Sequence, residues 1–133
     1  MTPETAQSIL DENFAPWVRA LKPKITEIGP KRTVLVIPID EEINRVGGIV
    51  SGQAIAALAD TAMVFACIGA LDKLEAVGTV TLDTQFLRPA SGEAIRAEAE
   101  VIRTGRAMIF ARCTLFAEPD GRPVAHATAT FAR

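Results

Sequence analysis

The chain has 133 residues, enough for one domain with a substantial hydrophobic core. Its 14 basic and 16 acidic residues leave a net charge of −2, and 49% of its residues are hydrophobic. This composition argues against a polycationic nucleic-acid-binding protein and against a disordered chain. The first 14 residues contain acids and no apolar stretch, so they do not have the pattern of a secretory signal. Together with two cysteines in apolar surroundings, this predicts a cytoplasmic protein with free buried thiols and a single domain over residues 1–133.

The N-terminal segment carries the signals of a short helical arm over about residues 1–22. Thr2 is a suitable N-cap, Pro3 suits the first helical position, and an acid follows in the first turn, so we expect a helix to about Glu12. A second short helical turn is expected over residues 17–21. Phe14 and Trp17 are the large aromatics of this arm. They either staple the arm to the core, or in addition form a wall of a substrate pocket.

Residues 51–71 form one long apolar segment, and Asp60 is the only charged residue between Val46 and Leu71. A helix that is apolar on all sides is typical of a protein core. The segment also has the length of a membrane span, but a central aspartate opposes insertion by about 2.5–3.5 kcal/mol, so we expect a core helix. A buried carboxylate without partners is costly, and Asp60 is therefore expected to have either a chemical role or a dedicated polar neighbour.

The segments around this helix have the pattern of strands. Residues 33–39 are rich in β-branched side chains, with Pro38 at an edge or at the strand end, and four segments after the helix alternate polar and apolar residues. The links between those four are of hairpin length, as at residues 118–121, so the strands are expected to be antiparallel. Alanine-rich faces at residues 97–99 and 125–129 would let a helix lie close. The sequence thus predicts an α+β fold in which a five- to six-stranded antiparallel sheet wraps one side of the helix, and a second copy covers the other side.

The segment GIVSGQ at residues 48–53, followed by LAD at residues 58–60, resembles a known motif. The motif is Gly-x-x-His-Gly-Gly, four residues, then Leu-Ala-Asp, and it belongs to the phenylacetate-degradation (PaaI) type of hotdog acyl-CoA thioesterases. Residues 79–83, 86–90, 104–106 and 124–131 are similar to later signatures of the same family. The resemblance extends over roughly residues 34–131 and implies the hotdog fold and a hydrophobic or aromatic acyl-CoA substrate.

The resemblance also implies roles for individual residues. Asp60 falls on the family's catalytic carboxylate, which acts as general base or nucleophile, and Gly52 falls on the glycine whose backbone N–H polarises the thioester carbonyl. Thr81 falls where some members carry a hydroxyl that positions the attacking water. In the family, the helix start of one subunit faces the mid-helix acid of the other, and the subunits form dimers or dimers of dimers. The further residues expected at the substrate are Asn44, Gly48, Met63, Arg88, Arg103 and Arg106, with the arginines either binding the phosphates of CoA or serving as solvated loop charges.

The chain departs from the family motif at three positions. Ser51 replaces the histidine, Gln53 replaces the second glycine, and Arg45 falls on the family's asparagine, with Asn44 one position out of register. Ser51 cannot carry a proton near neutral pH and is also a suitable helix cap. Catalysis would then depend on the carboxylate, backbone N–H groups and water, with Gln53 as an amide donor. The single histidine, His126, is expected at a surface or interface.

Three functions remain open at this point: an acyl-CoA thioesterase, a non-catalytic acyl-CoA-binding protein, and a hotdog hydratase or dehydratase. The hydratase needs a histidine beside the acid, which the sequence does not place there. A purely structural Asp60 that caps a helix start across a dimer is a further alternative. We expect no metal site, no cofactor apart from the CoA of the substrate, and neither a nucleic acid nor a membrane as partner.

Overall fold

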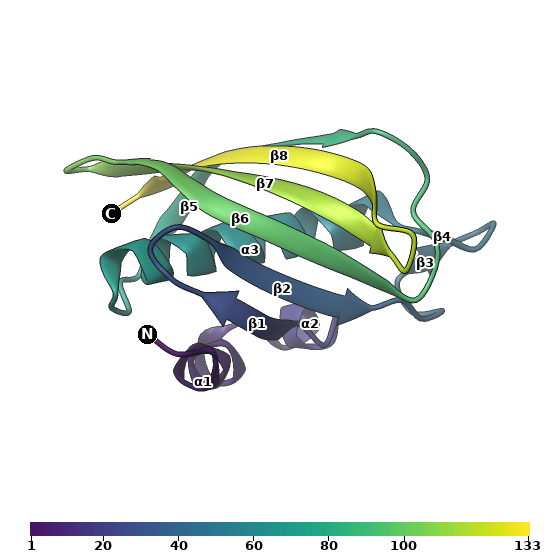
Figure 1. Ribbon diagram of the computed structural model, residues 1–133, viewed down its shortest axis with the longest axis horizontal. Helices are drawn as coiled ribbons and strands as arrows, with labels where there is room; N and C mark the ends of the chain where they lie inside the picture. The colour runs from purple at the N-terminus through teal and green to yellow at the C-terminus, as the bar shows by residue number, and fades with distance from the viewer.

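In the computed structural model, which describes residues 1–133, an antiparallel sheet curves around one long helix (Figure 1). The sheet has six strands in the order β1-β2-β6-β7-β8-β5, and a two-stranded hairpin, β3-β4, lies beside it. In chain order the elements are α1 (Pro3–Asn13), α2 (Pro16–Arg19), β1 (Lys24–Ile28), β2 (Thr33–Pro38), β3 (Asn44–Arg45), β4 (Ile49–Val50), α3 (Gly52–Leu71), β5 (Gly78–Phe86), β6 (Ala94–Thr104), β7 (Met108–Glu118) and β8 (Arg122–Ala132). The predicted α+β hotdog arrangement is confirmed.

Helix α3 forms the centre of the core. Ser51 is its N-cap, with Oγ accepting from the N–H of Ala54 at 3.3 Å, and Asp72 ends it in the left-handed conformation. Its length and apolarity would suffice for a membrane span, but 67% of its most apolar window is buried inside the fold. The buried side packs against small side chains of the sheet, namely Ala97, Ala99, Ala125, Ala127 and Ala129. These alanines allow the helix to approach closely, as the sequence predicts.

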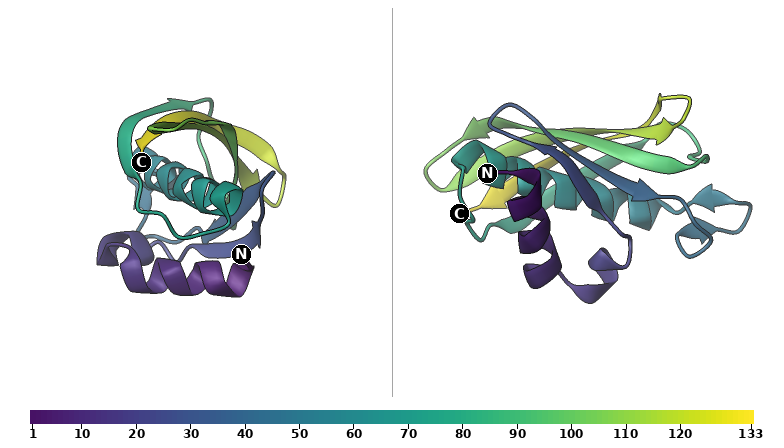
Figure 2. Two further views of the ribbon diagram at one scale, coloured as in Figure 1. Left: turned by 90° about the vertical axis from the view of Figure 1, so that its left-hand side faces the viewer. Right: turned by 60° about the horizontal axis from the view of Figure 1, so that its bottom comes forward.

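Within one chain the helix is not buried on all sides, as expected for a sheet that wraps only one side of it. Gln53 is exposed, and Ala57, Asp60 and Val64 are only half-buried, and these four residues follow the helical repeat along one stripe. Figure 2 shows why: the sheet forms an open C around α3, with β5 at one end and the N-terminal arm near the other. The stripe lies in the side of α3 that the sheet does not cover.

The N-terminal arm consists of α1 and α2 and lies against β1. Thr2 caps α1 by accepting from the N–H of Thr5 at 3.2 Å, as predicted. The Gln7 side chain accepts from the N–H of Ile25 at 2.9 Å and donates to the carbonyl of Pro23 at 3.1 Å, which satisfies part of the sheet edge. Strand β1 was not among the strands that the sequence predicts individually, and it provides the sixth strand of the sheet.

Strand β5 forms the other edge of the sheet and is exposed over almost its whole length. Val80, Leu82 and Phe86 on this strand are 53%, 37% and 53% exposed. An exposed edge with apolar side chains is a surface that proteins normally cover.

Candidate active site

Asp60 lies on the uncovered stripe of α3, half-buried, and its carboxylate accepts a hydrogen bond of 3.0 Å from the hydroxyl of Thr79 on β5. Burial raises the pKa of Asp60 above the ordinary range of an aspartate, and the Thr79 hydrogen bond lowers it in part. The aspartate therefore has the dedicated polar neighbour that its sequence context required. It is also more basic than a free carboxylate.

The hydroxyl beside Asp60 belongs to Thr79, whereas the family resemblance assigns a water-positioning hydroxyl to Thr81. Thr79 pairs with Phe131 and Thr81 pairs with Thr130, so a bulge at Val80 places two β5 residues on one step of β8. This extra residue puts Thr79 on the inner face, with Leu82 and Phe86. Thr81 lies on the outer face of the strand and does not face Asp60 of its own chain.

A small hollow adjoins the Asp60 carboxylate, with a volume of about 110 Å³. Phe14, Trp17 and Val18 of the arm form one wall, and Ala57, Asp60, Thr61 and Val64 of α3 form the other. Asp60 is the only ionisable group among these residues. The hollow is thus a largely apolar site with one carboxylate at its side, which suits an apolar group attached to a reactive centre.

A second hollow of about 410 Å³ lies at the start of α3. The Ser51 hydroxyl oxygen is engaged by Ala54, and the N–H of Gly52 has no acceptor within the helix. A Cβ on Gly52 would lie 3.3 Å from the ring of Phe86, which covers this position. The hollow is lined by Arg45, Ile49, Val50, Gly52, Ile55 and residues 86–90. Free N–H groups and the helix dipole make this end of α3 suited to developing negative charge.

The two parts of the site are separated within one chain. Gly52 and Asp60 are eight residues apart on one helix, which corresponds to about 12 Å along its axis. A thioester carbonyl at Gly52 is therefore out of reach of Asp60 of the same chain.

The remaining predicted residues are distributed over both ends of the fold. Gly48 has a positive φ of 72° in the turn before β4, and Gln53 is exposed one residue after Gly52. Asn44 on β3 holds a side-chain oxygen that is enclosed and accepts no hydrogen bond. Met63 is fully buried and lines neither hollow of the single chain.

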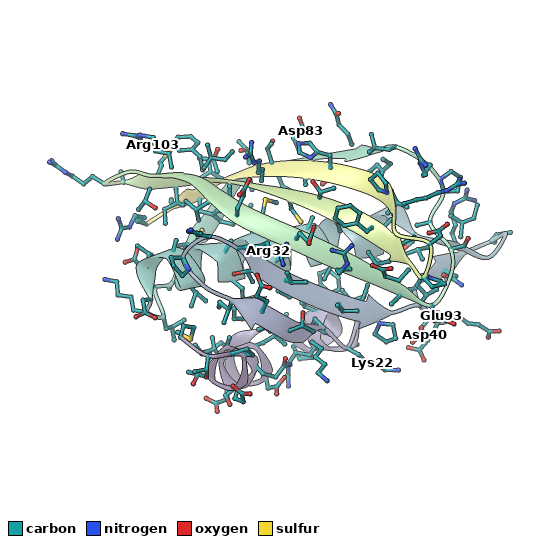
Figure 3. All side chains as sticks on the ribbon, viewed as in Figure 1. Lys22, Arg32, Asp40, Asp83, Glu93 and Arg103 are labelled. Atoms are coloured by element: carbon teal, nitrogen blue, oxygen red, sulfur yellow. The ribbon has the colours of Figure 1, made fainter.

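The three predicted arginines do not form one cluster within the chain. Arg88 borders the hollow at the start of α3, beside Arg45. Arg103 lies at the β6–β7 end of the sheet, opposite the end that carries Asp40 and Glu93 in Figure 3, and Arg106 follows in the same turn. His126 pairs with Gln85 and Thr114 on the outer face of the sheet, away from Asp60.

The model of the thioesterase superfamily matches residues 47–124. The chain belongs to the thioesterase superfamily. The match covers more than half of the chain and includes the start of α3, Asp60 and Thr79, while the arm with Phe14 and Trp17 lies outside it.

Solved structures of the superfamily agree with this assignment. A thioesterase family protein from Silicibacter pomeroyi is 29% identical, with a TM-score of 0.83 over 97% of this chain and 94% of that chain. The zebrafish thioesterase superfamily member 2 is 22% identical, with a TM-score of 0.86 over 99% and 98%. The PaaI protein of the Escherichia coli phenylacetic acid degradation operon is 19% identical, with a TM-score of 0.85 over 98% and 91%, and these last two show the shared fold. No curated protein matches the chain.

Proposed function

We propose that this member of the thioesterase superfamily is a homodimeric acyl-CoA thioesterase that hydrolyses the thioester of an apolar acyl group. The proposal depends on the surroundings of Asp60. Its carboxylate is half-buried, has a raised pKa, accepts a hydrogen bond from Thr79 and borders an apolar hollow. Perturbed carboxylates beside a cavity are candidates for general acid–base chemistry.

The dimer follows from what the chain leaves uncovered. The exposed edge of β5 and the uncovered stripe of α3 lie on the same side of the fold. One self-complementary contact with a second copy would cover both. An antiparallel approach of two α3 helices would also bring the start of one helix toward Asp60 of the other. The Gly52 N–H of one subunit and the Asp60 carboxylate of the other would then lie close together, although the two residues are about 12 Å apart within one chain.

In the proposed reaction, the thioester carbonyl accepts a hydrogen bond from the Gly52 N–H of one subunit. Asp60 of the other subunit takes a proton from water as the water oxygen attacks the carbonyl carbon. The tetrahedral intermediate carries its negative charge at the start of α3, and it collapses as the C–S bond breaks. The proton held by Asp60 passes to the departing thiolate of CoA. This sequence uses water and the residues of the chain alone, and it needs no histidine at position 51.

Asp60→Asn tests the acid. It keeps the shape of the side chain and removes the base, so kcat for acyl-CoA hydrolysis is expected to fall at least ~100-fold. The matched control is Asp83→Asn, which removes a carboxylate from the outer face of the same region and should leave kcat unchanged (Figure 3). Turnover by Asp60→Asn at the rate of the unchanged chain would remove the proposed mechanism.

Gly52→Pro tests the N–H donor at the helix start. Proline is tolerated at the first position of a helix and removes this N–H, so a loss of ~100-fold or more in kcat is expected. Gly52→Ala is the control, because it keeps the N–H and adds only the Cβ that meets Phe86 at 3.3 Å. If both substitutions cost the same, the steric contact rather than the hydrogen bond explains the effect.

Mixing the two variants tests the shared site. In a heterodimer of Asp60→Asn and Gly52→Pro chains, one site carries both changes and the other carries neither. Random exchange at equal amounts should therefore restore about a quarter of the original activity. No recovery after confirmed subunit exchange would contradict a site shared between two chains.

A second function is favoured by one observation, the absence of an imidazole beside Asp60, since Ser51 is occupied as the helix cap. A protein that binds acyl-CoA without hydrolysing it would bind CoA esters in calorimetry with no release of thiol. Thiol release at enzymatic rates would exclude this second function.

A further inference from the structure

Trp17 is a large apolar side chain that lies outside the hydrophobic core. It is 61% exposed on the short helix α2, and it is the only tryptophan of the chain. The neighbouring aromatic does hold the arm to the core: the Phe14 ring stacks on Phe65 of α3, with ring centroids 5.2 Å apart. Phe14 therefore attaches the arm to α3, and the exposed position of Trp17 has a different explanation.

Trp17 stands over the hollow beside Asp60. The side of this hollow opposite α3 consists of Phe14, Trp17 and Val18, all from the arm. An acyl group whose carbonyl carbon lies near Asp60 would have this hollow as its nearest apolar surroundings. A volume of about 110 Å³ is smaller than the ~150 Å³ cavity that takes up a benzene molecule.

The wall is held in place by the rest of the arm. Gln7 makes two hydrogen bonds to the backbone of the β1 segment, and Phe14 packs on Phe65 within the core. These contacts hold the middle of α1 and the residue that follows its end. Arg19 of α2 donates to the carbonyl of Phe14 at 3.0 Å, which ties α2, with Trp17 and Val18, to the held segment. A fixed wall around a small hollow limits the size of its occupant.

We infer that Trp17 and Val18 set the upper size of the acyl group, so that the site takes compact apolar acyl groups, no larger than one six-membered ring or a short chain, and disfavours long chains. The inference rests on the proposed function for the chemistry at Asp60. The residues that would select the substrate lie outside the segment that matches the superfamily model.

The test is a profile of kcat/KM over acetyl-, butyryl-, hexanoyl-, octanoyl-, dodecanoyl- and phenylacetyl-CoA. The unchanged chain is expected to have a higher kcat/KM for butyryl-, hexanoyl- and phenylacetyl-CoA than for dodecanoyl-CoA. Trp17→Ala should raise the ratio of dodecanoyl- to butyryl-CoA about tenfold, since removing a pocket wall alters discrimination by amounts of this order. Leu74→Ala is the control, because Leu74 is 54% exposed in the loop after α3 and lines neither hollow.

A merely structural Trp17 would lower kcat/KM for all six esters by the same factor, and that result would overturn the inference while leaving the thioesterase intact. Intrinsic fluorescence gives a second readout that does not depend on turnover. Because Trp17 is the only tryptophan and the chain has no tyrosine, its emission reports on the hollow directly.

Hexanoyl-CoA added to the Asp60→Asn protein should change the intensity or wavelength of this emission, and CoA without an acyl group should not. An equal response to both ligands, or none to either, would overturn the inference. If the unchanged chain shows no hydrolysis at all, the proposed function fails, and the fluorescence result alone decides where the acyl group binds.

Discussion

Gly69 offers a direct test of how closely α3 lies against the sheet. A Cβ at this position would be 2.7 Å from the carbonyl oxygen of Gly29 and 3.0 Å from Cγ1 of Ile28. The nearest atom belongs to the backbone of the turn between β1 and β2, and backbone yields less easily than the end of a side chain. Gly69→Ala must therefore displace either the helix or this turn.

The expected size of the effect is the difference of two contributions. Overpacking a well-packed core costs about 1–3 kcal/mol, whereas alanine favours a helix over glycine by up to ~1 kcal/mol. We expect a net loss of about 1–2 kcal/mol in the free energy of unfolding. For a chain of this length the entropy of unfolding is about 0.3 kcal/mol/K, so the Tm should fall by about 4–7 °C.

Thermal unfolding followed by circular dichroism, at one fixed protein concentration, measures this change. Gly78→Ala is the matched control, because a Cβ there meets nothing within 4 Å. It should leave the Tm within about 2 °C of the original value. A Gly69→Ala protein that is as stable as the parent would show that α3 does not approach the turn as closely as described.

Two further predictions concern titrating groups. Thr79→Val removes the donor that lowers the pKa of Asp60, so the acid limb of the pH–rate profile should move to higher pH. Thr81→Val, on the outer face of the same strand, is the control and should not move this limb. Equal pH–rate profiles for the two variants would count against the role of Thr79. Glu75 is bonded by Arg133 and by Lys73, which lower its pKa from 4.5 to about 2. Because the folded-state pKa is depressed, the stabilisation is complete above pH 4.5 and is lost as the pH falls to about 2. Glu75→Gln should therefore be less stable than the parent to urea at pH 7 and equally stable at pH 2, and a constant difference at both pH values would contradict the ion pair.

Several features of the fold can be predicted from the sequence because they follow from local patterns. The apolar run with its Ser51 cap predicts α3, and the turn chemistry of residues 118–121 predicts the link between β7 and β8. Alternation in the later segments identifies which residues face the core, including the alanines that contact α3. Asp60 is conspicuous in the sequence alone, because a charge within such a run requires a partner.

The surroundings of Asp60 were decided by tertiary structure. One extra residue at Val80 reverses the face of β5 from that point, and no local pattern predicts such a bulge. Thr79, and not Thr81, therefore faces the acid of the same chain. The uncovered stripe on α3 exists because the sheet curls only part of the way around the helix. The hollow beside Asp60 exists because the arm does not cover that stripe completely. Side-chain periodicity determines which residues can be buried, but only the path of the sheet and the arm determines which of them remain open to a substrate and a second subunit.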